Sequence, residues 1–135
     1  MVLRGRCACN SVRYEVVDEF IVAFNCHCSN CRATTGSAFL PWGEIECEKF
    51  RIVVGADSLL VDGDPDAAHA VFCGKCWSLV YWIPRAGYVR VPYGTLVDEP
   101  ALKPTAHMFV GSKAPWHEIP DDLPQHDEYP LVLIG

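Results

Sequence analysis

The chain has 135 residues, half of them hydrophobic, and a formal net charge of −6. This length and composition predict one globular domain spanning residues 1–135, with a buried core. No apolar run approaches the roughly 20 residues that cross a bilayer, and no stripe of lysine and arginine offers a footprint for nucleic acid. Neither a membrane nor a nucleic-acid partner is therefore expected. The first residues, MVLRGRC, contain no apolar leader, which favours a cytoplasmic protein.

The pattern of apolar residues predicts a mainly β domain. Residues 11–17 alternate between apolar and polar side chains, as a half-buried strand does. Residues 32–39 could form one short helical turn, which Gly36 would end, and no apolar period of 3.6 residues continues over a dozen positions. A proline-rich segment, residues 113–130, is expected to be extended and to pack through its apolar residues, Trp116 among them. Further strands are predicted at 20–26, 49–55, 57–63, 77–84, 88–97 and 105–111.

Seven of the eight cysteines fall in three tight clusters: Cys-x-Cys at 7–9, Cys-x-Cys-x-x-Cys at 26–31 and Cys-x-x-Cys at 73–76. An even number of cysteines also suits a disulfide framework, which is the alternative. Disulfides need an oxidising compartment and are usually spread along a chain, whereas clustering suits a metal ion. The pattern therefore favours metal sites.

Four of the clustered cysteines can complete one closed metal site. Side chains two apart on a strand point to the same face, so a Cys-x-Cys pair can direct two thiolates at one ion. In Cys-x-x-Cys a tight turn, which Gly74 allows here, does the same. The alternative, a redox pair, should open a helix, but residues 77–84 are strand-like. We therefore predict a tetrahedral structural zinc held by Cys7, Cys9, Cys73 and Cys76.

The remaining cluster supplies three ligands: Cys26, Cys28 and Cys31. Three protein ligands with an open fourth position are typical of catalytic zinc. The alternative is that Cys47 folds back and closes a second structural site. Residues 43–50 are predicted to form a strand that includes Cys47, and burial among apolar residues is the commoner state of a lone cysteine. His27 lies between two of the ligands, so its side chain is expected to point away from the metal.

Longer stretches of the sequence resemble one family. The segments GRCACNSVRYEV, CHCSNCRATTGSAF, FCGKC and PTAHMFVGSKAPWHEIPDDLPQHDE, in this order, are similar to the glutathione-dependent formaldehyde-activating enzymes, whose domain is shared by centromere protein V. The resemblance covers nearly the whole chain, and the combined cysteine pattern is specific. It implies small, coiled β-sheets organised around two zinc ions. The family usually has glycine where this chain has Asn10 and Trp77, so the subfamily and the substrate stay open.

The resemblance also implies an activity. The two cysteine sets match the family's structural and catalytic zinc ligands. The family joins glutathione to formaldehyde as S-hydroxymethylglutathione, or breaks that carbon–sulfur bond in reverse, so a carbon–sulfur lyase with a small thiol substrate is expected. Zinc at the three-cysteine site would bind the substrate sulfur as a thiolate and lower its pKa. Since zinc has no redox activity, no electron transfer is expected.

An anionic thiol such as glutathione needs cations nearby in an acidic protein. We expect Arg32 and Lys113 to offset substrate carboxylates or the charge of the site; the alternative for both is a solvated surface cation. Three aromatic residues could wall the pocket, although ordinary core positions are the commoner state of such side chains: Phe39, Trp42 and Trp116. The unranked candidates for a general base are His27, His107 and His117. Asp121 and Asp122 are expected to be exposed charges of the C-terminal segment.

Two other functions fit the same residues. A zinc-binding β-module without catalysis would serve protein interaction, and it is favoured if Cys47 closes the second site. A thiol–disulfide or metal-buffering protein would lose zinc readily to mild oxidants, with disulfides forming. The edge strands of a small β domain would also suit a homodimer.

Overall fold

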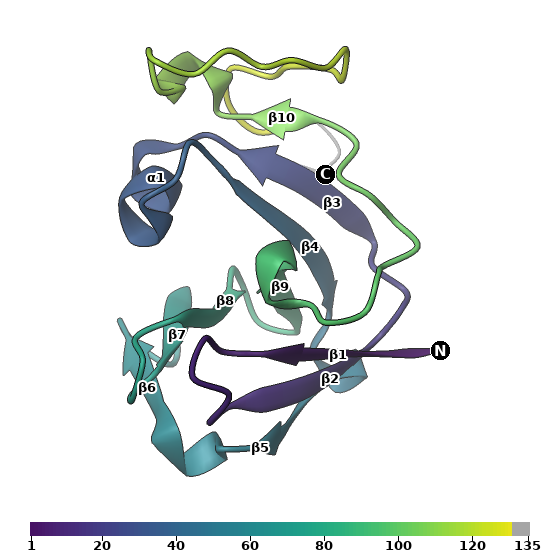
Figure 1. Ribbon diagram of the computed structural model, residues 1–135, viewed down its shortest axis with the longest axis vertical. Coiled ribbons are helices and arrows are strands. Elements are labelled where there is room, and N and C mark those ends of the chain that lie inside the picture. The colour runs from purple at the N-terminus through teal and green to yellow at the C-terminus, as the bar shows by residue number, and fades with distance from the viewer. Residues whose placement is uncertain (131–135) are drawn as a thin grey trace.

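Residues 1–130 are described by the computed structural model, and they form a mainly β domain, as predicted (Figure 1). The strands are β1 (Val2–Arg6), β2 (Arg13–Val17), β3 (Val22–Cys26), β4 (Leu40–Glu46), β5 (Phe50–Val54), β6 (Leu59–Asp62), β7 (His69–Cys73), β8 (Leu79–Ile83), β9 (Tyr88–Pro92) and β10 (His107–Met108). The helix α1 (Ser29–Thr35) follows β3. Short 3-10 helices lie between strands or after β10: η1 (Cys47–Lys49), η2 (Ala56–Ser58), η3 (Tyr93–Thr95) and η4 (Val110–Ser112).

Within residues 1–130 the strands form two sheets. A three-stranded sheet has the order β1-β2-β5, and a seven-stranded sheet has the order β10-β3-β4-β9-β8-β7-β6. Neighbouring strands are antiparallel except β10 and β3, which are parallel. Figure 1 shows the larger sheet curving from β10 at the top, through β3 and β4, down to β6, with α1 on the open side of the curve. The predicted strands at 49–55 and 57–63 are present as β5 and β6, but they belong to different sheets.

The three-stranded sheet follows from strict alternation of apolar residues. Leu3 of β1 and Tyr14 and Val16 of β2 are buried on one face, while their neighbours are exposed or half-buried. Gly5 pairs with Tyr14 across the sheet, and the tyrosine ring occupies the space that a side chain at position 5 would take. The Tyr14 hydroxyl reaches Thr95 Oγ1 at 2.6 Å, which satisfies this buried polar group.

The seven-stranded sheet buries a different set of residues on each face. Ile45 of β4, with Val89 and Val91 of β9, packs in the main core with the residues of the three-stranded sheet. Trp42, also of β4, faces the other way and belongs to a second apolar cluster with Phe24, Cys26 and Met108. Cys26 and the cavity that it lines lie on this second face.

Helix α1 begins earlier than residues 32–39, where the sequence predicted a helical turn. Cys28 is its N-cap, because the Cys28 sulfur accepts a hydrogen bond from the Cys31 backbone amide at 3.2 Å. The helix ends at Gly36, as expected, since this residue adopts the left-handed conformation (φ 64°) that favours glycine.

The packing predicted for Trp116 is wrong, because its side chain is 71% exposed. Among the described residues, none of the helices combines the length and apolar character needed to cross a bilayer.

We expect Gly5→Ala to destabilise the domain, because a Cβ at position 5 would lie 1.9 Å from the Tyr14 ring. Overpacking of this kind costs about 1–3 kcal/mol or more. Gly94→Ala is the matched control, since nothing lies within 4 Å of a Cβ there. Urea unfolding of both variants measures the difference. Equal stability of the two would mean that β1 and β2 do not pack in this register.

Candidate metal centres and active site

One cysteine centre brings together two turns that are far apart in the sequence, one after β1 and one between β7 and β8. Cys7 and Cys9 follow β1, whereas Cys73 ends β7 and Cys76 lies in the turn before β8. Their four sulfur atoms lie within 4.8 Å of one another, with Cys7–Cys9 at 3.6 Å and Cys9–Cys73 at 3.9 Å. Tetrahedral zinc–sulfur bonds of about 2.3 Å place the sulfurs about 3.8 Å apart. The spacing and the soft thiol donors therefore fit a tetrahedral metal ion such as zinc.

The two turns of this centre have the same local geometry. Asn10 and Trp77 each follow the second cysteine of a pair, and both adopt left-handed backbone with φ of 68° and 66°. This conformation favours glycine, the residue that the resemblance implied at these positions. Two backbone amides point at sulfur: Val12 donates to Cys7 at 3.3 Å and Lys75 donates to Cys73 at 3.4 Å. Such donors stabilise thiolates, which are the form that binds a metal.

The second centre lies where β3 meets α1. Cys26 ends the strand, Cys28 caps the helix and Cys31 lies in its first turn, and their sulfurs are within 4.8 Å of one another. Among residues 1–130, no fourth histidine, cysteine or carboxylate joins this group. Cys47 begins η1 and packs against the main core, so the structure does not bring it to the three cysteines. If a tetrahedral metal ion binds here, residues 1–130 supply three of its four ligands.

The three thiols of this centre perturb one another. Hydrogen bonds from Cys26 and Cys31 lower the pKa of the Cys28 thiol far below its usual value. Hydrogen bonding to Cys28 in turn raises the pKa of Cys26 to about 11, and hydrogen bonds with Cys26 and Cys28 raise the pKa of Cys31 even more. One thiolate therefore opposes ionisation of the others unless a cation compensates, which is what a divalent metal does.

The three cysteines border a cavity of about 210 Å³. The rest of its wall is largely the second face of the seven-stranded sheet, with Leu40, Trp42, Ala70, Phe72, Leu79, Trp82 and Pro92. Trp42 lines the cavity, as predicted. Phe39 and Trp116 are not in its lining: Phe39 packs on the His27 ring at 5.0 Å and Trp116 is exposed. Arg90 also lines the cavity. The sequence did not predict this role for Arg90, because its place opposite Glu44 depends on the pairing of β4 and β9.

The three candidate bases lie together, but none of them lines the cavity. His27 is fully buried and its Nε2 lies 2.8 Å from His107 Nδ1. The His107 Nε2 lies 3.0 Å from Asp121 Oδ1, and the His117 ring stacks 6.2 Å from that of His27. Asp121 is therefore a partner of a buried histidine, and not only the exposed charge that the sequence suggested. This histidine–aspartate chain holds the C-terminal segment against β3.

The two predicted substrate-binding cations engage the backbone. Arg32 of α1 donates to the Ser112 carbonyl at 3.1 Å. Lys113 donates to the carbonyls of Ala114, at 3.1 Å, and of His117. Neither residue is in the cavity lining. Their role toward a substrate stays a prediction.

Fold and geometry define the class: a small curled β protein with a closed four-cysteine centre and a three-cysteine centre beside a cavity. Comparison with known proteins then identifies the family. The sequence profile of the glutathione-dependent formaldehyde-activating enzymes matches residues 2–112. The chain therefore belongs to this family.

One relative agrees with this assignment, and one solved structure shares the fold. A protein of Halomonas elongata, named "Putative glutathione-dependent formaldehyde-activating enzyme", is 30% identical over 129 residues, which cover 88% of this chain and 82% of the relative. The crystal structure of a Rhodobacter sphaeroides protein superposes with a TM-score of 0.58 at 22% identity, covering 73% of this chain and 91% of the other. The second comparison shows the fold alone.

We expect the buried His27 to make the domain less stable below neutral pH. Burial lowers the pKa of His27 from 6.5 to about 4, and the neighbouring His107 adds to this effect. Between these two values the unfolded state binds the proton and the folded state does not, so stability falls as the pH falls below about 6.5. Between about pH 7.5 and pH 5.5 the loss is roughly 1 kcal/mol.

Urea unfolding at constant metal content measures this loss. His27→Gln should flatten the pH dependence, whereas His69→Gln, which changes a histidine hydrogen-bonded only to the Ala67 carbonyl, should keep it. The same slope in both variants would contradict the assignment to His27.

We also expect the two centres to respond differently to loss of a ligand. Cys76→Ser should lower the free energy of unfolding by several kcal/mol or prevent folding, because a closed centre ties β1 to β7 and its metal contributes directly to folding. Cys28→Ser should leave the domain folded with reduced metal content. Urea unfolding and metal analysis of both variants test this pair, and equal destabilisation would indicate two structural centres.

Proposed function

We propose that the protein is a zinc-dependent carbon–sulfur lyase that forms or cleaves the adduct of a small thiol, such as glutathione, with formaldehyde. The observation that carries the proposal is the three-cysteine centre, which has no fourth protein ligand within residues 1–130 and borders a cavity. Membership of the formaldehyde-activating family supports the same reaction.

In this proposal the chain contributes ligands, a shaped wall and nearby charge. Cys26, Cys28 and Cys31 hold a catalytic zinc, and Cys7, Cys9, Cys73 and Cys76 hold a structural one. Zinc bound by three thiolates would supply a Lewis acid that lowers the pKa of a substrate thiol. The apolar wall of the cavity, Trp42 and Trp82 included, lowers the local dielectric and excludes water from the reacting sulfur.

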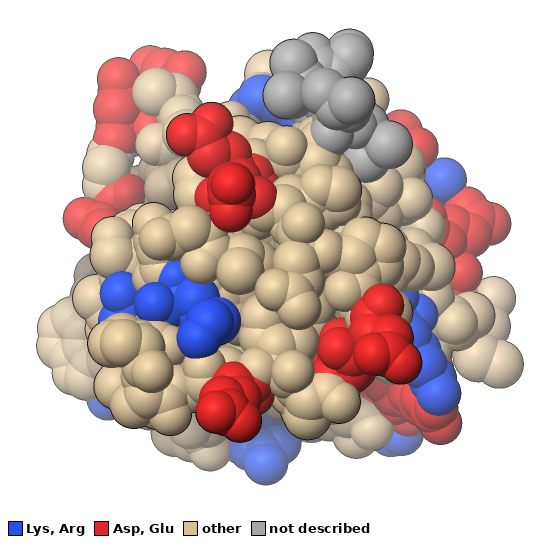
Figure 2. Space-filling model, turned by 90° about the horizontal axis from the view of Figure 1, so that it is seen from above, with Lys and Arg blue, Asp and Glu red and all other residues tan. Residues whose placement is uncertain are grey.

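Arg32 and Lys113 enter the proposal as cations that offset the charge of the open centre or of a substrate carboxylate. Both contribute to the positive charge around His27, which lies between two ligands of that centre. Figure 2 shows a largely uncharged face with acidic and basic groups scattered around it. Metal centres built from cysteine thiolates also need a reducing compartment, which suits the cytoplasm.

A homodimer would pair through the edge strand β6, where Leu60 and Val61 are exposed.

We expect metal analysis to find two zinc ions per chain. X-ray absorption at the zinc edge should then report a rise in mean sulfur coordination when glutathione is added, because only the open centre can accept another thiolate. Cys28→Ser should abolish this rise together with turnover, measured as S-hydroxymethylglutathione formed above the spontaneous rate.

Two results would contradict the proposal. Four sulfurs at both ions before glutathione is added would favour the non-catalytic zinc module. Release of zinc with disulfide formation under mild oxidation would favour a metal-buffering protein.

A further inference from the structure

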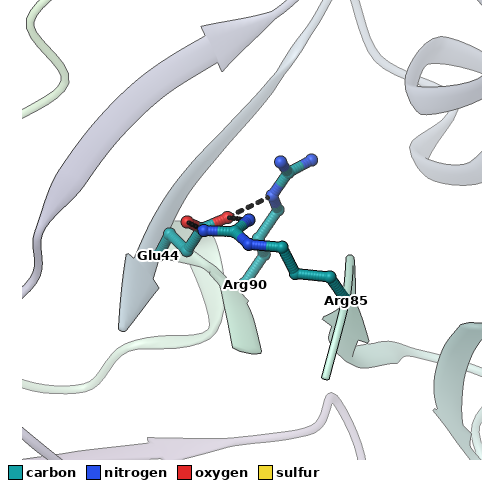
Figure 3. Close-up of polar contacts among 3 residues, drawn as sticks. All are labelled: Glu44, Arg85 and Arg90. Atoms are coloured by element: carbon teal, nitrogen blue, oxygen red, sulfur yellow. Dashed lines mark hydrogen bonds and ion pairs between the residues drawn. The ribbon is translucent and has the colours of Figure 1, made fainter. Parts of the chain in front are cut away.

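A buried carboxylate fixes the orientation of Arg90. Glu44 is 2% exposed and pairs with the Arg90 Nε at 2.9 Å and with the Arg85 guanidinium at 2.9 Å. Figure 3 shows Glu44 meeting Arg90 at its Nε edge, with the two terminal nitrogens of Arg90 pointing away from the carboxylate. In the described part of the chain, neither terminal nitrogen has a hydrogen-bond acceptor. Two terminal nitrogens of a fixed cation, with four N–H donors, are thus left over.

The guanidinium of Arg90 lies over the Trp42 ring, with its Cζ 4.3 Å from the ring centroid. Both residues line the cavity that the three cysteines border. In strand pairing, Leu40 lies opposite Cys26 and Trp42 lies two positions further along β4. Arg90 itself lies opposite Glu44, two positions beyond Trp42, so Trp42 lies between the arginine and the cysteine centre along β4.

An arginine with two free terminal nitrogens matches a carboxylate, which it can bind with two parallel hydrogen bonds. A peptide thiol carries its carboxylate apart from its sulfur, so one molecule can present the sulfur to the cysteine centre and the carboxylate to Arg90 in the same cavity. The acidic residue of the lining, Asp62, is exposed on the edge strand β6, where solvent screens its charge.

We propose that Arg90, oriented by Glu44 and stacked on Trp42, binds a carboxylate of the thiol substrate. It thereby selects thiols that carry a carboxylate, such as peptide thiols, over thiols that lack one. This inference rests on the proposed thiol-adduct function, which it deepens by naming the group that recognises the substrate. Sequence reasoning assigned such a role to Arg32 and Lys113, whereas Arg90 is the arginine in the cavity lining.

The test compares glutathione with its diethyl ester, which lacks the carboxylates, on the zinc-loaded protein. Arg90→Gln should raise the KM and the calorimetric Kd for glutathione about 10- to 100-fold, the effect of losing charge-assisted hydrogen bonds. The values for the ester and the kcat for glutathione should change little. An equal rise for both thiols, or no rise for either, overturns the inference, as does a rise for glutathione with Arg32→Ala and none with Arg90→Gln.

Arg85→Gln is the matched control, because Arg85 pairs with the same carboxylate but is not in the cavity lining. It should leave the preference for glutathione over the ester unchanged. The double variant Glu44→Gln with Arg90→Gln leaves no unpaired buried charge, so it tests the same loss if the single variant does not fold. Arg90→Lys keeps the charge and should recover part of the affinity.

Failure of the inference and failure of the proposed function give different results. If the parent protein turns glutathione over but Arg90→Gln has no effect on KM or Kd, the inference fails and the function stands. If the parent binds glutathione through Arg90 without turnover, the inference stands and the lyase fails. If the parent neither binds nor turns over glutathione, both are overturned.

Discussion

The four-sulfur centre is the constraint on which the rest of the structure depends. It joins the turn after β1 to the end of β7, residues 64 positions apart in the sequence for Cys9 and Cys73. Chain closure over such a span carries an entropic cost, which metal–thiolate bonds at this centre would offset. With this junction made, the three-stranded sheet is fixed on one face of the larger sheet, and the opposite face is free to form a cavity.

The two centres use the same side chain in different surroundings. In the closed centre, two tight turns meet and every ligand position is supplied by the chain. In the open centre, a strand runs directly into a helix, and Cys28 serves both as ligand candidate and as N-cap. Three cysteines in six residues cannot provide a fourth sulfur without a loop that returns, and the described chain has none there. The path of the backbone therefore determines which centre has four cysteines and which has three.

The sequence was sufficient for the fold class, most strands and the grouping of the cysteines, because strand alternation and ligand spacing are local. It placed α1 too late, since a cysteine N-cap is not a usual start signal. It did not reveal the partners of Glu44 or of His107, because cross-strand pairs and contacts with the C-terminal segment depend on register and tertiary packing. Trp116 shows the reverse error, as a large aromatic residue need not be buried.

The support behind the open centre is unequal on its two sides. Cys26 ends a central strand that β10 flanks in parallel, and His27 is fixed through His107 to Asp121. On the other side, α1 buries none of its residues. The helix is thus the less supported side of the centre, and we expect it to move more than the strand if a ligand is exchanged there. Flexibility of the centre is therefore expected in the seven residues of α1 and not in β3.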